Sequence, residues 1–431
     1  MLSWNARRLT TAAGCALLVI STVGTGTAAA APGQGIPAQV RVAEQRQLRE
    51  IEAPAAWRLT KGRGITVAVL DTGVDATAAD LAGSVTTGPD YTKGANPPGY
   101  HPPHLHGTFI ASLIGGHGSG PGRAEGVLGI APAAKILSVR VIPDDQEPGF
   151  GLYNASPRFT DAVGRGIRYA VRHGAQVINM SLGGPSPSRQ TRGAVAYAIA
   201  HGVVVVAAAG NNGSGHASFS PYSYPASYTG VISVAAATGQ GTRAFFSERN
   251  SSVLISAPGV KIVGAGPGGQ YIQASGTSPA SAFVAGVAAL IRAAHPRLSP
   301  ALVAQALITS ARHQPAADYS PSTGFGEVDA VAAMRAASRL TSTRPSTGLA
   351  PSGHFAPAAG PIQVTHRDTA RIGAYGAVAA AGVLGFLAAT LFLGARARGR
   401  RRARQRSSGQ PGPPGFAGTG PTGFPASGTG M

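Results

Sequence analysis

Short, nearly continuous apolar runs recur through the middle of the chain and alternate with segments of helical periodicity. Five such runs, each bounded by turn residues, lie at 65–70, 136–141, 176–180, 203–208 and 231–235. Strands that are apolar on both faces are typical of a parallel sheet covered by helices on both sides. The pattern therefore predicts an α/β domain with a mainly parallel sheet, arranged in three layers.

Segments with helical spacing separate and follow these runs. They lie at 161–173, 191–201, 279–294, 300–311 and 327–338. Pro279 and Pro300 each follow a serine that can cap a helix, and proline in the first turn sacrifices no hydrogen bond. In such domains catalytic and binding groups gather at the carboxyl ends of the strands. Candidate catalytic residues are therefore expected at those ends.

The first thirty residues have the layout of a secretory signal peptide. Arg7 and Arg8 precede an apolar run at 12–23 and a small-residue stretch at 28–31. The alternative, an anchoring helix, is disfavoured because this run is too short to cross about 30 Å of hydrocarbon at about 1.5 Å per residue. The only cysteine, Cys15, lies within this segment, so we expect an exported chain without disulfides.

A second apolar segment, at 372–395, contains no charged residue and is long enough to span a bilayer. Seven arginines follow within 396–406, which by the positive-inside rule places the tail in the cytoplasm. A buried core helix is the alternative, disfavoured by those arginines. We expect a single-pass cell-membrane protein with a proline-containing stalk at 341–371 and a basic, then Gly/Pro-rich, tail at 396–431.

The distribution of charge along the chain limits the kinds of partner that the protein is expected to bind. The chain has 431 residues and a formal net charge of +19, but only 12% of its residues are charged and 43% are hydrophobic, which excludes a wholly disordered chain. Much of the basic excess lies at the termini and points to membrane topology. We therefore expect no nucleic-acid partner, and we expect no cofactor and no metal.

Four polar residues stand where predicted strands end or helices begin. Asp71 follows the first run, Asn211 follows the fourth, His106 opens His-Gly-Thr-Phe-Ile-Ala, and Ser278 lies in Ser-Gly-Thr-Ser-Pro-Ala. Acyl transfer requires a nucleophile, a general base, a carboxylate that fixes the tautomer of the base, and an oxyanion donor. This set supplies one residue of each type.

Three alternative assignments involve residues near these four: a different catalytic acid, a zinc site and a calcium site. Asp75 is a second acid near the first strand, and we expect it to be a solvent-facing turn residue. A zinc site at His101, His104 and His117 lacks acidic or cysteine partners, and solvated histidines are favoured. A calcium site in the acidic loop 144–147 lacks the spacing of a known calcium loop, and a solvated loop is favoured.

The ordered motifs Asp-Thr-Gly, His-Gly-Thr, Ser-Leu-Gly-Gly, Ala-Ala-Ala-Gly-Asn and Gly-Thr-Ser resemble those of the subtilisin-like serine peptidases, over roughly residues 60–340. With the signal peptide at 1–30, an N-terminal segment at 31–60, a peptidase domain at 61–340 and one terminal span, the chain looks like a mycosin. Mycosins are membrane-anchored subtilases associated with type VII secretion. Proline next to the nucleophile, at Pro279, departs from the usual pattern.

The resemblance implies a serine endopeptidase that hydrolyses peptide bonds. It implies that Ser278 is the nucleophile, His106 the general base, Asp71 its orienting partner and Asn211 the oxyanion donor. It also implies that an extended peptide substrate pairs with the edge formed by Ser181, Leu182 and Gly183. The implied partners are a protein or peptide substrate and a membrane secretion complex. The alternative function is a structural subunit of that complex whose proteolysis is secondary.

Overall fold

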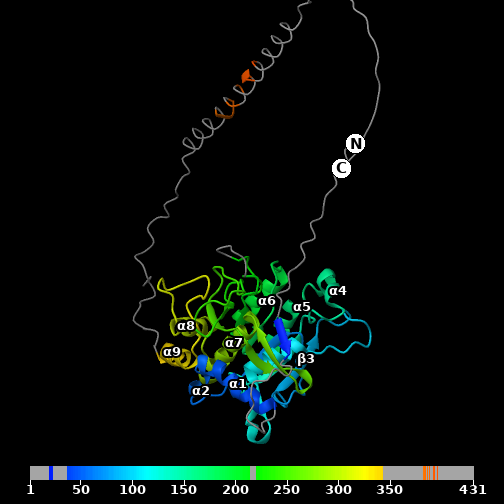
Figure 1. Ribbon diagram of the computed structural model, residues 1–431, viewed down its shortest axis with the longest axis vertical. Coiled ribbons are helices and arrows are strands. Elements are labelled where there is room, and N and C mark those ends of the chain that lie inside the picture. The colour runs from blue at the N-terminus through cyan, green and yellow to red at the C-terminus, as the bar shows by residue number, and fades with distance from the viewer. Residues whose placement is uncertain are drawn as a thin grey trace, which may run out of the picture. The chain divides into compact units, whose positions relative to one another are not determined.

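The computed structural model describes residues 19–22, 36–213 and 220–342, and in the carboxyl-terminal part residues 382–384, 386, 388, 392–393 and 396. The chain divides into two compact units, Met1–Thr347 and Gly348–Met431. The first unit contains every sheet formed by the described residues (Figure 1). The described residues of the second unit are helical, and several of its large apolar side chains are exposed: Val383, Leu384, Phe386, Phe392 and Leu393.

A seven-stranded parallel sheet forms the centre of the first unit, in the order β10-β9-β8-β7-β2-β6-β3. Its strands are β2 (Thr66–Asp71), β3 (Val85–Asp90), β6 (Lys135–Arg140), β7 (Val177–Met180), β8 (Val204–Ala208), β9 (Ile232–Ala237) and β10 (Ile255–Pro258). The five predicted strands are all present. The sequence pattern missed the two edge strands because β3 is polar and half-exposed, and β10 ends in a proline, Pro258, which weakens a strand signal.

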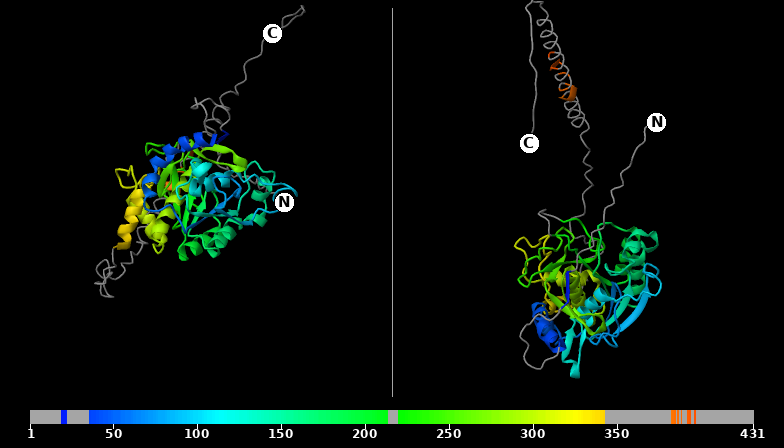
Figure 2. Two further views of the ribbon diagram at one scale, coloured as in Figure 1. Left: turned by 90° about the horizontal axis from the view of Figure 1, so that it is seen from below. Right: turned by 45° about the vertical axis from the view of Figure 1, so that its right-hand side comes forward.

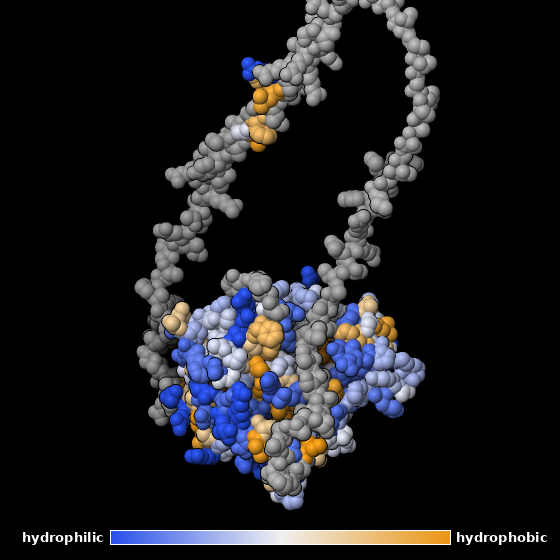
Figure 3. Space-filling view, in the orientation of Figure 1, coloured by the Kyte–Doolittle hydropathy of each residue, from blue (hydrophilic) through white to orange (hydrophobic). Residues whose placement is uncertain are grey.

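Helices cover both faces of this sheet, which confirms the three-layer prediction (Figures 1 and 2). On β2, Val67 and Val69 face a core that includes α3 (Leu105–Gly115) and α7 (Thr277–Ala294). Ala68 and Leu70 face a second core with α5 (Ala162–Arg172) and α6 (Arg189–Ala200). Alternate side chains of a strand point to opposite faces, so a continuous apolar run fills both layers. Polar side chains predominate on the outer face seen in Figure 3, where apolar ones form separate patches.

Smaller elements complete the first unit. A three-stranded antiparallel sheet contains β1 (Val19–Thr22), β12 (Tyr271–Ser275) and β11 (Ile262–Ala265), and a two-stranded sheet contains β4 (His117–Ser119) and β5 (Glu125–Leu128). The remaining helices are α1 (Ile36–Glu50), α2 (Ala53–Ala56), α4 (Phe150–Ala155), α8 (Pro300–Thr309) and α9 (Ala330–Ser342), with short 3-10 turns at Pro121–Arg123, Pro157–Phe159 and Pro267–Gly269.

Helix starts bear out one predicted cap and correct the other. Ser299 caps α8, since its side chain accepts a hydrogen bond from the Leu302 N–H. Ser278 is not a cap, because α7 begins one residue earlier, at Thr277, after Gly276. Ser278 and Pro279 therefore both lie in the first turn of α7, where backbone N–H groups have no partner inside the helix.

Among the described residues one helix, α7, is long and apolar enough to cross a membrane, and 83% of it is buried inside the first unit. It is thus a buried helix in the core of the first unit. The predicted span at 372–395 lies largely outside the described residues. The predicted stalk beyond Ser342, most of the tail and the signal peptide other than Val19–Thr22 also lie outside them, whereas the first two stalk residues belong to α9.

Candidate active site

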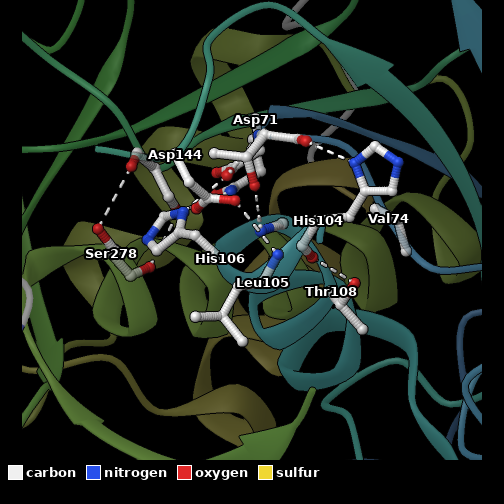
Figure 4. Close-up of polar contacts among 12 residues, drawn as sticks. Asp71, Val74, His104, Leu105, His106, Thr108, Asp144 and Ser278 are labelled. Carbon is white, nitrogen blue, oxygen red and sulfur yellow. Dashed lines mark hydrogen bonds and ion pairs between the residues drawn. The ribbon is translucent and has the colours of Figure 1, made fainter. Parts of the chain in front are cut away.

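Asp71 and His106 meet at the carboxyl end of β2. Asp71 is the last residue of this strand, and His106 is the second residue of α3. The Nδ1 atom of His106 lies 2.6 Å from Asp71 Oδ1, which also accepts a 2.7 Å hydrogen bond from the Thr72 N–H. The Asp71 side chain is 1% exposed and the His106 side chain is 11% exposed, so the pair is largely removed from water. Figure 4 shows Asp71, Asp144 and Ser278 around the His106 ring.

Two glycines allow this close approach of strand and helix. A Cβ atom on Gly107 would lie 2.0 Å from the carbonyl oxygen of Gly73. Gly73 has a φ of +93°, a conformation that other residues rarely adopt. The Gly107 N–H donates to the Thr72 hydroxyl at 3.0 Å, which joins the start of α3 to the turn after β2. The Asp-Thr-Gly and His-Gly-Thr motifs thus shape the backbone around the Asp71–His106 contact.

The surroundings of His106 favour its protonated form. Burial disfavours the imidazolium, but the charge and hydrogen bond of Asp71, with smaller contributions from Asp144 and Asp145, outweigh it and raise the pKa of His106. Asp144 also accepts a hydrogen bond from the Leu105 N–H at 3.3 Å. Burial raises the pKa of Asp144 to about 6, although the nearby imidazole opposes this. The site therefore holds a second acid beside the imidazole.

The acidic loop at 144–147 is only partly the solvated loop that the sequence suggested, since Asp145 and Gln146 are exposed but Glu147 is not. Glu147 is 4% exposed, and its Oε2 atom lies 2.7 Å from the guanidinium of Arg140, which is also buried. Arg140 donates to the Thr72 carbonyl at 2.6 Å, next to Asp71. Glu147 in turn accepts from the Asp144 N–H at 2.9 Å. A buried ion pair therefore links the turn after Asp71 to the loop that carries Asp144.

Ser278 and Asn211 face the same cleft from α7 and the end of β8. Ser278 Oγ donates to the Ser181 carbonyl at 3.3 Å, and Ser278 and His106 line one pocket. The amide oxygen of Asn211 accepts from both the backbone N–H and the hydroxyl of Thr277, each at 2.9 Å. These two contacts fix the orientation of the Asn211 amide, with its oxygen toward Thr277 and its Nδ2 donor on the opposite side.

Two pockets adjoin these residues, and both are lined by 181–184, Asn211 and Ser278. The first has a volume of about 330 Å³ and includes His106, Asp144 and apolar side chains of Ile142, Tyr153, Leu182 and Tyr228. The second has a volume of about 250 Å³ and includes Gly210, Asn212, Glu248 and Thr277. The predicted substrate edge therefore separates two cavities of different chemistry.

The competing candidates have other contacts: His104 Nδ1 lies 2.8 Å from the Thr72 carbonyl oxygen. Asp75 accepts from Thr77 and from the Gly268 N–H, and it is half-buried. His117 is buried and contacts the backbone carbonyls of Ala82 and Gly118, so the expectation that it is solvated was wrong. Within the described residues, no group of three histidine, cysteine, aspartate or glutamate side chains is placed to hold a metal.

Sequence reasoning gave no role to Arg140 and Glu248 and expected Glu147 to be solvated, yet all three are buried, and Glu248 lines the second pocket. Arg140 ends β6, next to Asp71 in the parallel register, so the rule about strand ends pointed to it. Glu248 lies in the long connection between β9 and β10 and gave no comparable signal. Arg140 and Glu147 are only seven residues apart, but their pairing depends on how the loop after β6 folds back, and Glu248 meets Asn212 from 36 residues away.

The N-terminal segment lies outside both pockets. Arg41 of α1 donates to the carbonyls of Glu125 and Gly126, and Gln47 exchanges two hydrogen bonds with Val263. Glu44 accepts from the Leu128 N–H and pairs with Arg41 at 2.8 Å. None of the α1 residues lines either cavity next to Ser278. The helix thus braces β5 and β11.

Comparison with known proteins agrees with this geometry. Residues 62–328 match the Subtilase family. An intracellular serine protease of Paenibacillus polymyxa is 38% identical over 265 residues, which cover 60% of this chain and 77% of that protein. The solved structure of the MycP3 protease from the type VII (ESX-3) secretion system is 30% identical, with a TM-score of 0.56, and the match covers 70% of this chain and 90% of that one. MycP1 from Mycobacterium smegmatis is 27% identical, with a TM-score of 0.56, and the match covers 75% of this chain and 88% of that one.

Proposed function

This chain belongs to the Subtilase family of serine proteases, and we propose that Ser278, His106 and Asp71 form its catalytic triad. The observation that carries this assignment is the 2.6 Å contact between His106 and Asp71 beside a pocket that His106 shares with Ser278. One nitrogen of the imidazole faces the carboxylate, which leaves the other for the serine hydroxyl. The chain would act as an endopeptidase on protein substrates.

In this mechanism Ser278 Oγ attacks the substrate carbonyl carbon, and His106 accepts the hydroxyl proton. The Ser278 hydroxyl must first rotate away from the Ser181 carbonyl. This rotation costs little free energy because the hydrogen bond that it breaks is long, at 3.3 Å. His106 then protonates the leaving amine, and water repeats the sequence on the acyl-enzyme. Asp71 holds the Nδ1–H tautomer throughout and stabilises the imidazolium, in line with the raised pKa of His106.

Asn211 would stabilise the oxyanion together with the backbone N–H of Ser278. The fixed amide orientation supports this role, because Thr277 holds the oxygen of Asn211 and leaves Nδ2 for the substrate. The Ser278 N–H lies in the first helical turn of α7 and is not used by the helix ladder. Two such donors aimed at developing charge supply a large part of the rate in acyl transfer.

The substrate would bind as an extended strand along the backbone of Ser181, Leu182 and Gly183. Main-chain pairing with such an edge is β-augmentation, and alternate side chains of the peptide then enter opposite cavities. The side chain of Ser181 has a structural role, since its Oγ accepts from Asn179 and contacts Ser281. Its backbone is the part offered to the peptide.

We further propose that the protein is exported, anchored in the cell membrane by residues 372–395, and active with a type VII secretion system. The support is the uncharged segment followed by seven arginines, together with the similarity to solved proteases from such systems. In this topology the peptidase domain, at 61–340, lies outside the cell and the tail, at 396–431, lies in the cytoplasm. A protease added outside intact cells would then cut the stalk and spare the tail.

Labelling with an irreversible serine-directed phosphonate tests the catalytic assignment. The full-length chain should gain one adduct on Ser278, located by mass, and Ser278→Ala should lose both the adduct and peptide hydrolysis while keeping its unfolding curve. Labelling that persists in Ser278→Ala would show that the nucleophile is another residue.

A complementation experiment distinguishes the proteolytic function from the alternative, in which the protein is a structural subunit of the secretion complex. If Ser278→Ala restores secretion fully in a strain that lacks the protein, the scaffold role is primary. If it fails as completely as the deletion while the membrane complex stays assembled, proteolysis carries the function.

A further inference from the structure

The second pocket has a buried carboxylate among its lining groups that the catalytic assignment does not use. Glu248 is 3% exposed and lines the cavity together with Ser278 and Asn211. Its Oε1 atom accepts from the Asn212 side chain at 3.1 Å, whereas Oε2 has no hydrogen-bond partner within the described structure. A buried carboxylate oxygen without a partner costs free energy, so this arrangement calls for an explanation.

The backbone leaves room for this carboxylate where other residues would fill it. A Cβ atom at Gly210 would lie 2.5 Å from Oε1 of Glu248. The Glu248 N–H donates to the Gly210 carbonyl at 2.9 Å, which fixes the acid beside the turn that carries Asn211. Burial raises the pKa of Glu248, and hydrogen bonding with Asn212 opposes that effect. Within the described structure no arginine or lysine donates a hydrogen bond to Oε2.

The direction of each substrate side chain determines which substrate residue would contact Glu248. Successive side chains of an extended peptide point in opposite directions. Both pockets border the oxyanion donor Asn211 and Ser278, but the pocket that contains Glu248 excludes His106, which lines the other pocket. The residue whose carbonyl is attacked therefore directs its side chain toward Glu248, and the preceding residue directs its side chain toward His106.

We propose that Glu248 is a specificity-determining residue and that this pocket takes a basic side chain, lysine or arginine, from the residue whose carbonyl is attacked. The inference rests on the proposed role of Ser278. Its physical basis is that the free Oε2 atom would gain a charged hydrogen-bond donor, while Oε1 keeps Asn212. A hydrogen bond to a charged group contributes about 1.5–3 kcal/mol, which corresponds to a preference of about 10- to 150-fold.

A structural role for Glu248 is the competing explanation. The acid holds Asn212 and thereby the turn that positions Asn211, so its loss would then slow every substrate equally. Glu248→Gln distinguishes the two roles because the amide keeps an oxygen for Asn212 and loses only the charge.

The test uses the full-length chain and two peptides that differ only at the residue before the cut bond, lysine in one and norleucine in the other. Norleucine keeps the four-carbon chain of the lysine side chain and lacks its ammonium group. We expect the unaltered protein to prefer lysine by at least about tenfold in kcat/KM. Glu248→Gln should reduce this preference to within about twofold by lowering kcat/KM for lysine alone. Glu50→Gln, the same change at an acid of α1 outside both pockets, should leave the preference intact.

A second measurement does not depend on catalysis. Binding of p-aminobenzamidine, a fluorescent aromatic cation, to Ser278→Ala protein should weaken about tenfold or more when Glu248 is also changed to glutamine. An equal loss for both peptides, or the absence of a lysine preference together with unchanged p-aminobenzamidine binding, would overturn the inference. Failure of the catalytic assignment looks different, since phosphonate would then not label Ser278 and neither peptide would be cut.

Discussion

Replacing Glu147 by glutamine leaves the Arg140 guanidinium buried beside a neutral partner. In the native protein the Glu147 side chain is 1% exposed and the Arg140 side chain is 4% exposed, and their charged groups lie 2.7 Å apart. Glu147 also accepts from Asn96 and from the Asp144 N–H. Glutamine keeps one oxygen acceptor at nearly the same volume, so the substitution removes the charge and changes the packing little.

The expected cost follows from the burial of both groups. Breaking a buried ion pair by removing one charge costs about 3–5 kcal/mol, because the remaining charge is left without compensation. Asp90 lies 3.4 Å from Arg140 Nε and is 41% exposed, so it offsets a small part of the loss. We therefore expect the free energy of unfolding to fall by about 3 kcal/mol.

The matched control is Glu50→Gln, which breaks the Arg46–Glu50 pair on α1. This pair has the same 2.7 Å contact, but Arg46 is 69% exposed. Exposed pairs contribute about 0–1 kcal/mol, so the control should fall by less than about 1 kcal/mol. The difference between the two variants isolates burial as the cause.

Urea unfolding of the full-length chain, followed by the fluorescence of Trp57, measures both variants. The Trp57 indole donates to the Ile130 carbonyl and packs against the main core, so its signal reports on the peptidase domain. Activity should fall as well in Glu147→Gln, because Arg140 holds the Thr72 carbonyl and Glu147 holds the Asp144 loop. If Glu147→Gln and Glu50→Gln lose the same free energy within about 0.5 kcal/mol, the buried pair does not brace the site as argued.

Three further predictions concern the oxyanion donor, the acid beside His106 and the N-terminal helix. Asn211→Ala should lower kcat by about 10²–10³ with little change in KM, and a loss below tenfold in steady-state kinetics would assign the oxyanion to another group. Asp144→Asn should move the acidic limb of the kcat/KM profile to lower pH, because Asp144 helps to raise the pKa of His106, and an unmoved limb would contradict that coupling. Burial raises the pKa of Glu44 from 4.5 to about 8, so the folded state binds a proton that the unfolded state has released. Stability should therefore decline as pH rises through that window, and urea titrations of Glu44→Gln should show a shallower decline.

The strands and helices at the centre of the domain could be predicted from sequence because their patterns are local. Runs such as 203–208 are apolar on both faces, and the structure places β8 within a residue of that range. The edge strand β3 escaped prediction, since half-exposed polar residues in Val85–Asp90 form a strand only because β6 offers a partner. Sheet pairing is a tertiary contact that a single segment does not encode.

The same distinction applies to the site. Asp71, His106, Asn211 and Ser278 each stand in a short motif at an element boundary, so the sequence marks them. Asp144 and Glu147 lie in a loop whose composition favours solvent, and only the arginine at the end of β6 makes burial of Glu147 acceptable. A charged side chain can be assigned to the interior only when its partner is known, and here the partner lies on a strand.

The distribution of charge around the cleft differs from that of the chain as a whole. The net charge is +19, yet Asp144, Asp145 and Glu248 all line the two pockets that meet at Ser278. Much of the basic excess lies in the terminal segments, and in physiological salt charges farther than about 8 Å are largely screened. A bound peptide therefore experiences mainly the local acids, which favour cationic side chains, and Asp144 and Asp145 among them also raise the pKa of His106. The carboxylates of the two pockets would thus have different effects, with Glu248 acting on substrate choice and Asp144 and Asp145 on the strength of the general base.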